Sequence, residues 1–352
     1  MNGDTNLTGP PIYHNWQLAL RGETSNFAFE TPLFTDAHIT SKQIVEKYGP
    51  YEFINTVPIR NRLHLLQPAI VLRVERYINY KQPKMDETKE DYYHGGSLVD
   101  EAAALVSLCL GIRIKAGDTS REFSKEGDPR GLPISSRFAE TPNLPPVHHP
   151  PVLPRAIETH SLDKISTISK LHQLRAQDAT ALLRAARLFQ DGIWISETDP
   201  LLSWIMLVSA VEATAGDYWK SYDTRAKKRG ATRRFVDFVL RFLPIPPSNR
   251  PEKWACLDWQ SISMQENLTK IYSYRSRALH EGIPFPAPMG SPPLYQSFET
   301  KAWEEVPSGL ASSVEEHVWL KKDLPMNLHI FEYIVRNCIL KWWQDTANNI
   351  AA

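Results

Sequence analysis

The stretch Ile271–Gly282, IYSYRSRALHEG, carries an arginine and a histidine separated by four residues, Arg275 and His280. Apolar residues recur at helical spacing before the arginine, which predicts a helix that ends near the histidine. Gly282 suits the left-handed position that follows many helices, and Pro284 prevents the helix from continuing. We therefore expect His280 in the last turn of a helix.

The chemistry of these two side chains suits work on a phosphate ester. The negative end of the helix dipole favours a protonated imidazole at His280, and a histidine is a common general acid or base. An arginine such as Arg275 holds phosphate oxygens through two parallel hydrogen bonds. Residues five apart, however, lie about 140° apart around a helix, so the two side chains do not share one face. The two side chains can meet only by reaching around the helix, through a frayed last turn, or across two copies of the chain. The alternative is that the motif has no function and is a plain helix end with a favourable histidine and a solvated arginine.

Two stretches together resemble a known superfamily. The arginine, four residues and histidine of Arg275–His280 resemble the signature of HEPN proteins, and the tyrosine before them and glycine after them look most like the Apea-like HEPN group. Residues 200–216, PLLSWIMLVSAVEATAG, look like the apolar helix that precedes the motif in that group, with Glu212 near its end. The resemblance covers about 161–348. The family favours Asn, Asp or His after the arginine, where this chain has Ser276.

The resemblance implies a metal-independent endoribonuclease that needs no cofactor and cuts RNA by attack of the 2′-hydroxyl. His280 would be the acid or base and Arg275 would hold the phosphate, with both motifs of a homodimer meeting in one composite active site. Such proteins often act in prokaryotic antiviral defence or stress response, sometimes as toxins with an antitoxin or regulatory partner. The alternative is a non-catalytic HEPN-like module that binds RNA, a nucleotide or a protein.

Several other residues are candidates for supporting roles. Tyr274, Ser276 and Glu212 are expected near the arginine, and Glu212 is expected to pair with Arg275 or Arg277 or to form a structural salt bridge. The run RAKKRGATRR at 225–234 holds six cations and no acid, so it is either an RNA-binding patch or a solvated loop. The candidate RNA-binding residues are Lys227, Lys228, Arg229, Arg233, Arg234 and Arg277.

Composition narrows the class of protein. The 352 residues, 42% of them hydrophobic, suggest two domains, and 40 basic residues balance 40 acidic ones. RNA binding would therefore need a local basic patch. Three scattered cysteines, the absence of a signal-like start and the absence of a long apolar run favour a cytoplasmic protein that does not enter a membrane.

The domain prediction follows from proline and helical periodicity. Six prolines in 141–154 predict a stiff linker between a smaller N-terminal domain at 1–140, regulatory or target-selecting, and a HEPN-like helical domain at 155–352. The predicted fold class is mainly α, with an unassigned N-terminal fold for which α+β is one option. The adjacent His148 and His149 point apart in an extended chain, so we expect no metal there.

Elements of the N-terminal part are predicted with different clarity. Ser97 is a good N-cap for a helix over 97–111, whereas 65–80 fits a strand or a helix equally well. Short strands are expected around Phe27, and a loop is expected over 115–137. The turn at 93–96 precedes a helix N-terminus, where a small-ligand site is an alternative to a plain capped turn.

Helices are expected throughout the C-terminal part, with a long connection over 285–325. The helix over 201–216 is apolar nearly all round and is expected to be central and buried. The other expected helices cover about 162–171, 182–189, 232–242, 262–281 and 328–343.

Overall fold

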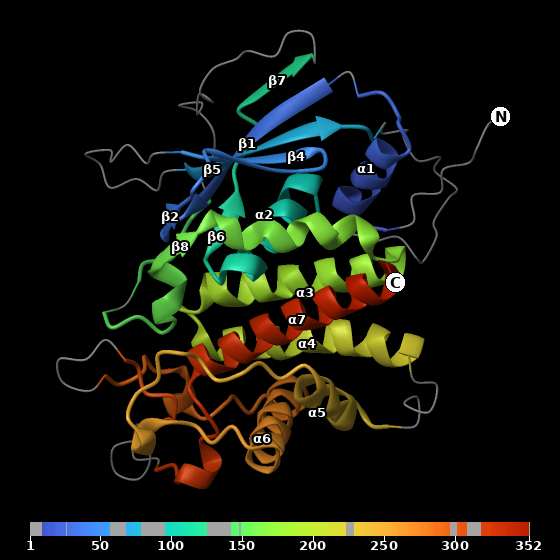
Figure 1. Ribbon diagram of the computed structural model, residues 1–352. Helices are drawn as coiled ribbons and strands as arrows, with labels where there is room; N and C mark the ends of the chain where they lie inside the picture. The colour runs from blue at the N-terminus through green and yellow to red at the C-terminus, as the bar shows by residue number, and fades with distance from the viewer. Residues whose placement is uncertain are drawn as a thin grey trace. The chain divides into compact units, whose positions relative to one another are not determined.

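A computed structural model describes residues 9–25, 27–56, 68–78, 96–124, 142–147, 149–222, 229–295, 301–307 and 318–351 (Figure 1). The fold is mainly helical and includes an antiparallel sheet, in agreement with the predicted class. The chain forms two compact units. Unit 1 comprises Met1–Leu144, Thr159–Arg187 and Gln344–Ala352, and unit 2 comprises Pro145–Glu158 and Leu188–Trp343. Two C-terminal segments thus group with the N-terminal residues, and the predicted functional boundary at 141–154 stays a prediction.

Unit 1 is built on a six-stranded sheet with the order β3-β4-β5-β1-β6, in which β7 also pairs with β1. All the pairings of this sheet are antiparallel. Two further strands, β2 and β8, form a short parallel pair. The strands are β1 Phe27–Thr35, β2 His38–Thr40, β3 Val45–Tyr48, β4 Tyr51–Asn55, β5 Pro68–Arg76, β6 Ile114–Ala116, β7 Arg121–Ser124 and β8 Thr159–Ser161.

The structure resolves the ambiguous apolar segment as strand β5. Its residues pair with β1 on one side and with β4 on the other, so β5 is a central strand of the sheet. Of the two structures that the sequence allowed, the strand is therefore correct, as the period-two pattern of side chains indicated. The expected strand at Phe27 is confirmed as β1. The expected loop over 115–137 is wrong in part, because β6 and β7 pair with β1 there, and the rest of it lies outside the described residues.

Helices α1 Pro11–Leu20 and α2 Leu98–Leu110 belong to unit 1. The predicted cap of α2 is confirmed: the Ser97 hydroxyl accepts a hydrogen bond from the Asp100 amide, and the Asp100 carboxylate accepts one from the Ser97 amide. Gly111 ends the helix at φ 72°, a conformation that favours glycine. Most of α2 is buried, including the carboxylate-bearing Glu101.

The first expected helix of the C-terminal part is a 3₁₀ helix, Leu162–Gln173, and it belongs to unit 1. Its buried residues Leu162, Ile165, Ile168 and Leu171 recur strictly every third position. A 3₁₀ helix has three residues per turn, so this spacing places all four side chains in one row. The sequence analysis predicted a helix here but did not distinguish the three residues per turn of a 3₁₀ helix from the 3.6 of an α-helix.

The long helices of the chain lie wholly or partly in unit 2. These are α3 Ala176–Ile195, which begins in unit 1, α4 Pro200–Tyr222, α5 Ala231–Arg241, α6 Ser261–His280 and α7 Leu328–Ala351, which ends in unit 1. The Trp204 ring stacks on Phe331 and Phe285 with centroids 4.7 and 5.5 Å away. Its indole N–H donates to the Met289 carbonyl oxygen, so a core tryptophan fixes part of the long connection against α4.

Helix α4 differs from its expected form in two ways. It continues beyond Gly216 to Tyr222, so Glu212 lies within the helix rather than near its end. It buries one face only, since Leu202 is exposed while Trp204, Leu207 and Val208 are fully buried. The expected burial of this segment is therefore confirmed for one stripe of α4, while the other residues of 201–216 are half-buried or, at Leu202, exposed.

Candidate functional site

Helix α6 ends as the sequence predicts. His280 is its last helical residue, and Gly282 follows at φ 70°, which turns the chain away. The Ile283 amide donates back to the Arg277 carbonyl oxygen. Open space surrounds the position of a side chain at Gly282, so the backbone conformation rather than crowding requires glycine there.

Helices α4, α5 and α6 pack on one another in unit 2 (Figure 1). Arg275 of α6 contacts α4. One oxygen of Glu212 on α4 accepts a hydrogen bond from the Arg275 guanidinium, and the other accepts one of 2.7 Å from the Tyr272 hydroxyl. Tyr272 and Arg275 are three residues apart on α6, so they share a face. We call Glu212, Tyr272 and Arg275 the arginine cluster.

The arginine cluster holds Arg275 in a defined position. Its guanidinium carbon lies 5.7 Å from the centre of the Tyr272 ring, within the range of a cation–π contact. The side chains of Arg275 and Glu212 are 19% and 25% exposed. Among the described residues, the buried Nε of Arg275 has no hydrogen-bond partner. The arginine is therefore fixed on one side and keeps unused hydrogen-bonding capacity.

Electrostatics keep the Tyr272 hydroxyl protonated. Burial raises its pKa to about 12, and the hydrogen bond to the Glu212 carboxylate adds to the shift. The positive charges of Arg275 and Arg234 oppose it. Tyr272 therefore acts as a hydrogen-bond donor to Glu212 throughout the neutral range. The sequence prediction missed Tyr272, because its partner lies 60 residues away in the chain.

His280 does not join the arginine cluster within one chain. It is exposed at the end of α6, whereas Arg275 packs against α4. Five residues of helix separate the two by about 7.5 Å along the axis and by about 140° around it. This geometry matches the spacing derived from the sequence, and it leaves a second copy of the chain or a rearrangement to bring the groups together.

The other supporting residues predicted near Arg275 lie elsewhere. The Tyr274 hydroxyl donates to the Asp323 carbonyl oxygen at 2.8 Å, and its ring packs against Phe285. Ser276 is half-buried, and its hydroxyl forms no hydrogen bond with the described residues. Arg277 pairs with the exposed Glu281 at 3.7 Å. Of the predicted neighbours, the structure thus brings Glu212 alone to Arg275.

The predicted basic patch is partly neutralised. Asp237 on α5 pairs with Arg229 at 3.0 Å and with Arg233 at 3.4 Å. The Arg229 guanidinium also lies 5.5 Å from the centre of a Trp219 ring. Arg234 is half-buried, and its positive charge opposes the rise in the pKa of Tyr272. Lys227 and Lys228 lie outside the described residues.

No three histidine, cysteine, aspartate or glutamate side chains gather as a metal site among the described residues, in which His149 is exposed and His148 is not included. No described helix is both long and apolar enough to span a bilayer.

Comparison with known proteins gives no family assignment. No protein-family model matches the chain, and no curated protein and no solved structure matches it.

Proposed function

We propose that this chain is a metal-independent endoribonuclease of the HEPN type. The observation that carries the proposal is the arginine cluster, in which Glu212 and Tyr272 hold the arginine of the Arg-x4-His motif while its Nε has no partner in the described part of the chain. Arginine held in this manner offers a fixed positive charge and free donors to a phosphate. The exposed imidazole of His280 is accessible to a large substrate such as RNA.

The proposed reaction is an internal displacement at phosphorus. The 2′-oxygen forms a bond to the adjacent phosphorus as its proton passes to a base, and the bond from phosphorus to the 5′-oxygen breaks as that oxygen receives a proton. The products are a 2′,3′-cyclic phosphate and a 5′-hydroxyl. His280 would move these protons, and Arg275 would stabilise the charge on the phosphate oxygens.

A homodimer resolves the separation of the two motif residues. A two-fold axis brings equivalent helix ends together, so the His280 side chains of two copies would lie in one cleft. One imidazole would then accept the 2′-proton and the other would donate a proton to the leaving oxygen. The composite site thus supplies the base and the acid that the displacement needs.

The first test is cleavage of purified cellular RNA in the presence of EDTA. We expect wild-type cleavage with 2′,3′-cyclic phosphate ends, and a loss of about 10²–10⁴-fold for His280→Ala. Matched controls are His38→Ala, an exposed histidine of β2, and Lys270→Ala on α6. Equal cleavage by wild type and His280→Ala, or cleavage that EDTA abolishes, would exclude the proposal.

A mixing experiment tests the composite site. Wild-type and inactive His280→Ala proteins are mixed in equal amounts, and about a quarter of the re-formed dimers keep both His280 side chains. If the two imidazoles act together in one cleft, the rate falls to about a quarter of that of wild type at the same total concentration. A rate of about half after proven subunit exchange would show that each chain acts alone and would exclude the composite site.

A non-catalytic HEPN-like module is the second candidate. The ion pair between Arg275 and Glu212 favours it, because a paired arginine is also what a purely structural role requires. In that reading the module binds RNA, a nucleotide or a protein partner, and wild type binds labelled RNA without cutting it.

The biological setting belongs to the proposal as well. We expect a role in prokaryotic defence or stress response, in which unit 1 or an antitoxin partner restrains the nuclease. Co-purification of a second, stoichiometric chain from the native host, with inhibition of RNA cleavage on its re-addition, would identify such a partner.

A further inference from the structure

One aromatic side chain of unit 2 is open to solvent. Trp254, in the short 3₁₀ helix η5 Lys253–Ala255, is 54% exposed. It is the only exposed tryptophan, tyrosine or phenylalanine in the part of the chain that the structure describes. An indole ring is large, rigid and flat, so it offers a surface on which another flat ring can stack. The surroundings of Trp254 indicate which kind of ring that is.

The neighbouring Trp303 leaves at least one face of this indole uncovered. The two rings are perpendicular, at 89°, and their centroids are 4.5 Å apart. In such a T-shaped pair the edge of one ring meets the face of the other, so Trp303 covers one face of Trp254 at most. The Nε1 atom of Trp254 donates to the Glu252 carboxylate at 2.7 Å, and this bond uses the edge of the ring. Trp254 thus presents an open aromatic face.

A buried ion pair fixes the backbone beside Trp254. The Glu304 side chain is 2% exposed and accepts hydrogen bonds from the Arg250 guanidinium at 2.6 and 2.8 Å. It also accepts one from the Leu257 amide at 2.9 Å. The Glu304 amide in turn donates to the carbonyl oxygen of Ala255, the last residue of η5. A surface held in this way loses little conformational freedom when a ligand binds, which favours affinity.

Three lysines belong to the same surface. Lys253 is exposed within η5, and Lys321 lies close to η5 through Glu305. The Lys321 Nζ is 2.7 Å from the Glu305 carboxylate, and the Glu305 amide donates to the carbonyl oxygen at the end of η5. Lys322 is exposed as well, and neither it nor Lys253 forms an ion pair with the described residues. An open aromatic ring near free cations is typical of sites that bind single-stranded nucleic acids.

A second 3₁₀ helix connects this surface to the motif helix. This helix, η8 Lys321–Asp323, contacts α6 because the Tyr274 hydroxyl donates to the Asp323 carbonyl oxygen at 2.8 Å. Tyr274 lies on α6 six residues before His280. Contacts therefore lead from the motif helix to η8 and from η8, through Glu305, to η5. An RNA strand that reaches the motif can follow this path to the open indole.

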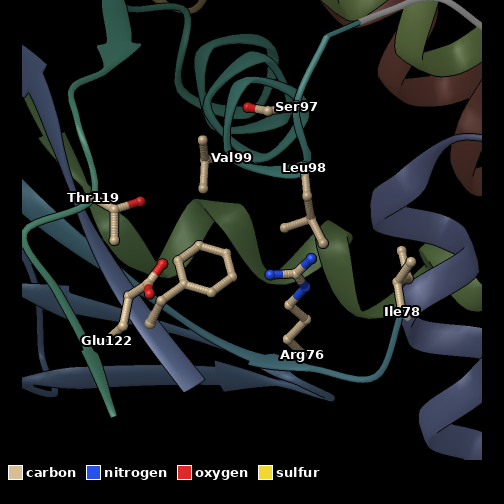
Figure 2. Close-up of a pocket in the computed structure, with 8 residues that line it drawn as sticks. Arg76, Ile78, Ser97, Leu98, Val99, Thr119 and Glu122 are labelled. Carbon is tan, nitrogen blue, oxygen red and sulfur yellow. The ribbon is translucent and has the colours of Figure 1, made fainter. Parts of the chain in front are cut away.

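A pocket in unit 1, between the sheet and the first turn of α2, is a poorer site for a nucleotide (Figure 2). Its volume of about 150 Å³ is below the roughly 300–1,000 Å³ of sites for larger ligands. Its basic side chain, Arg76, already interacts within the chain, and the carboxylate of Glu122 repels phosphate. At the helix start, the Asp100 carboxylate accepts hydrogen bonds from the amide and hydroxyl of Ser97, so negative charge already occupies this end.

From this arrangement we infer that Trp254, Lys253, Lys321 and Lys322 form a binding surface for single-stranded RNA, which we call the tryptophan platform. One base stacks on the open face of the indole, and the lysines neutralise neighbouring phosphates. The inference deepens the proposed function and rests on it, since it specifies the substrate of the motif as single-stranded. The bases of a duplex are stacked on one another, so a duplex cannot use the platform.

The test is the binding of a labelled 2′-O-methyl oligouridylate of about 12 nucleotides to the full chain, measured by fluorescence anisotropy. The blocked 2′-oxygen cannot attack phosphorus, so binding is measured without cleavage. We expect Trp254→Ala to bind at least about fivefold more weakly, because one stacked base is lost, and Trp254→Phe to keep most of the affinity. The matched control is Ile262→Ala, which changes another exposed apolar residue of unit 2 and should bind as wild type does.

The salt dependence of the same binding tests the lysines. For single strands, the slope of log affinity against log salt changes by about 0.7 for each phosphate contact. Lys322→Gln should therefore reduce the slope by about 0.7, whereas the control Lys42→Gln, at an exposed position of unit 1, should leave it unchanged. An unchanged slope for Lys322→Gln would overturn its assignment to a phosphate.

Three results would overturn the platform: no binding of the probe by wild type up to about 100 μM, wild-type affinity in Trp254→Ala, or equal affinity for a duplex of the same length. A changed oligomeric state of Trp254→Ala with unchanged RNA binding would assign the tryptophan to a protein contact instead. Cleavage of ordinary RNA tests the proposed function separately. Binding that depends on Trp254 without any cleavage would support the platform and contradict the nuclease, whereas cleavage with binding independent of Trp254 would contradict the platform alone.

Discussion

Two arginine–carboxylate clusters, one in each unit, differ in how fully their hydrogen bonds are used. In unit 1, Glu30 is fully buried and accepts hydrogen bonds from both Arg73 and Arg121. In unit 2, Glu212 is 25% exposed and binds one arginine, Arg275. All three arginine side chains are 19% exposed, so burial does not separate the clusters.

The difference lies in the Nε atoms of the arginines. Those of Arg73 and Arg121 both donate to Glu30, at 2.8 and 2.5 Å, whereas the buried Nε of Arg275 has no partner among the described residues. A buried donor without a partner costs about 1–3 kcal/mol. In the cluster of Glu30, Arg73 and Arg121, both Nε atoms thus have a hydrogen-bond partner, as is expected of a purely structural ion pair. The arginine cluster keeps one buried donor, the Nε of Arg275, without a partner among the described residues.

The largest expected effect is on the stability of unit 1. Glu30→Gln replaces the fully buried carboxylate that Arg73 and Arg121 share with a neutral group, and we expect a loss of about 3–5 kcal/mol in the free energy of unfolding. The matched Glu212→Gln should cost about 1–2 kcal/mol, because its site is partly open to solvent. Urea unfolding followed by circular dichroism measures both. Equal losses would remove the distinction between the two clusters.

A third carboxylate extends the comparison to pH. Glu101 on α2 accepts a hydrogen bond from the Ile12 amide, and burial raises its pKa to about 8. The folded state then holds the proton more tightly than the unfolded state, so this group lowers stability as the pH rises from about 4.5 to about 8. We expect Glu101→Gln to flatten the decline over that window. A parallel decline in both proteins, measured by urea unfolding at each pH, would contradict the assignment.

The smallest expected effect comes from the tyrosine of the arginine cluster. Tyr272→Phe removes one hydrogen bond to Glu212, so the cleavage rate should fall by less than about tenfold. The raised pKa, about 12 against an ordinary 10, means that this hydroxyl contributes stability below pH 10 that is lost as the pH rises to about 12. Thermal unfolding of both proteins across this range should show a shallower decline for the variant. Identical curves for the two proteins would show that the Tyr272 proton does not contribute to the pH dependence of stability.

Local sequence chemistry predicted the ends of elements better than their partners. The cap at Ser97 and the turn at Gly282 depend on residues within the same few positions, so the sequence was sufficient for both. Strand β7 was missed because its four residues form a strand only by pairing with β1. The strict three-residue period of the 3₁₀ helix was present in the sequence, but it was interpreted as α-helical.

The candidate site shows the same limit. The motif spacing predicted that Arg275 and His280 point in different directions, which follows from helix geometry alone. The pairing of Arg275 with Glu212 was one of three alternatives, and only the packing of α6 on α4 selects it. Tyr272 and the unbonded Nε of Arg275 are products of tertiary structure, so no local pattern indicates them.

The most direct test is the single-turnover cleavage rate of a labelled RNA in EDTA, compared among wild type, Arg275→Lys and Arg275→Ala. If Arg275 holds the reacting phosphate, Arg275→Ala should lose about 10²–10³-fold, as for the removal of a donor to a developing oxyanion. Arg275→Lys should recover part of the rate, because lysine keeps the charge but lacks the two-pronged geometry. Cleavage by Arg275→Ala within about threefold of wild type, below 1 kcal/mol, would contradict a role for this arginine in the reaction.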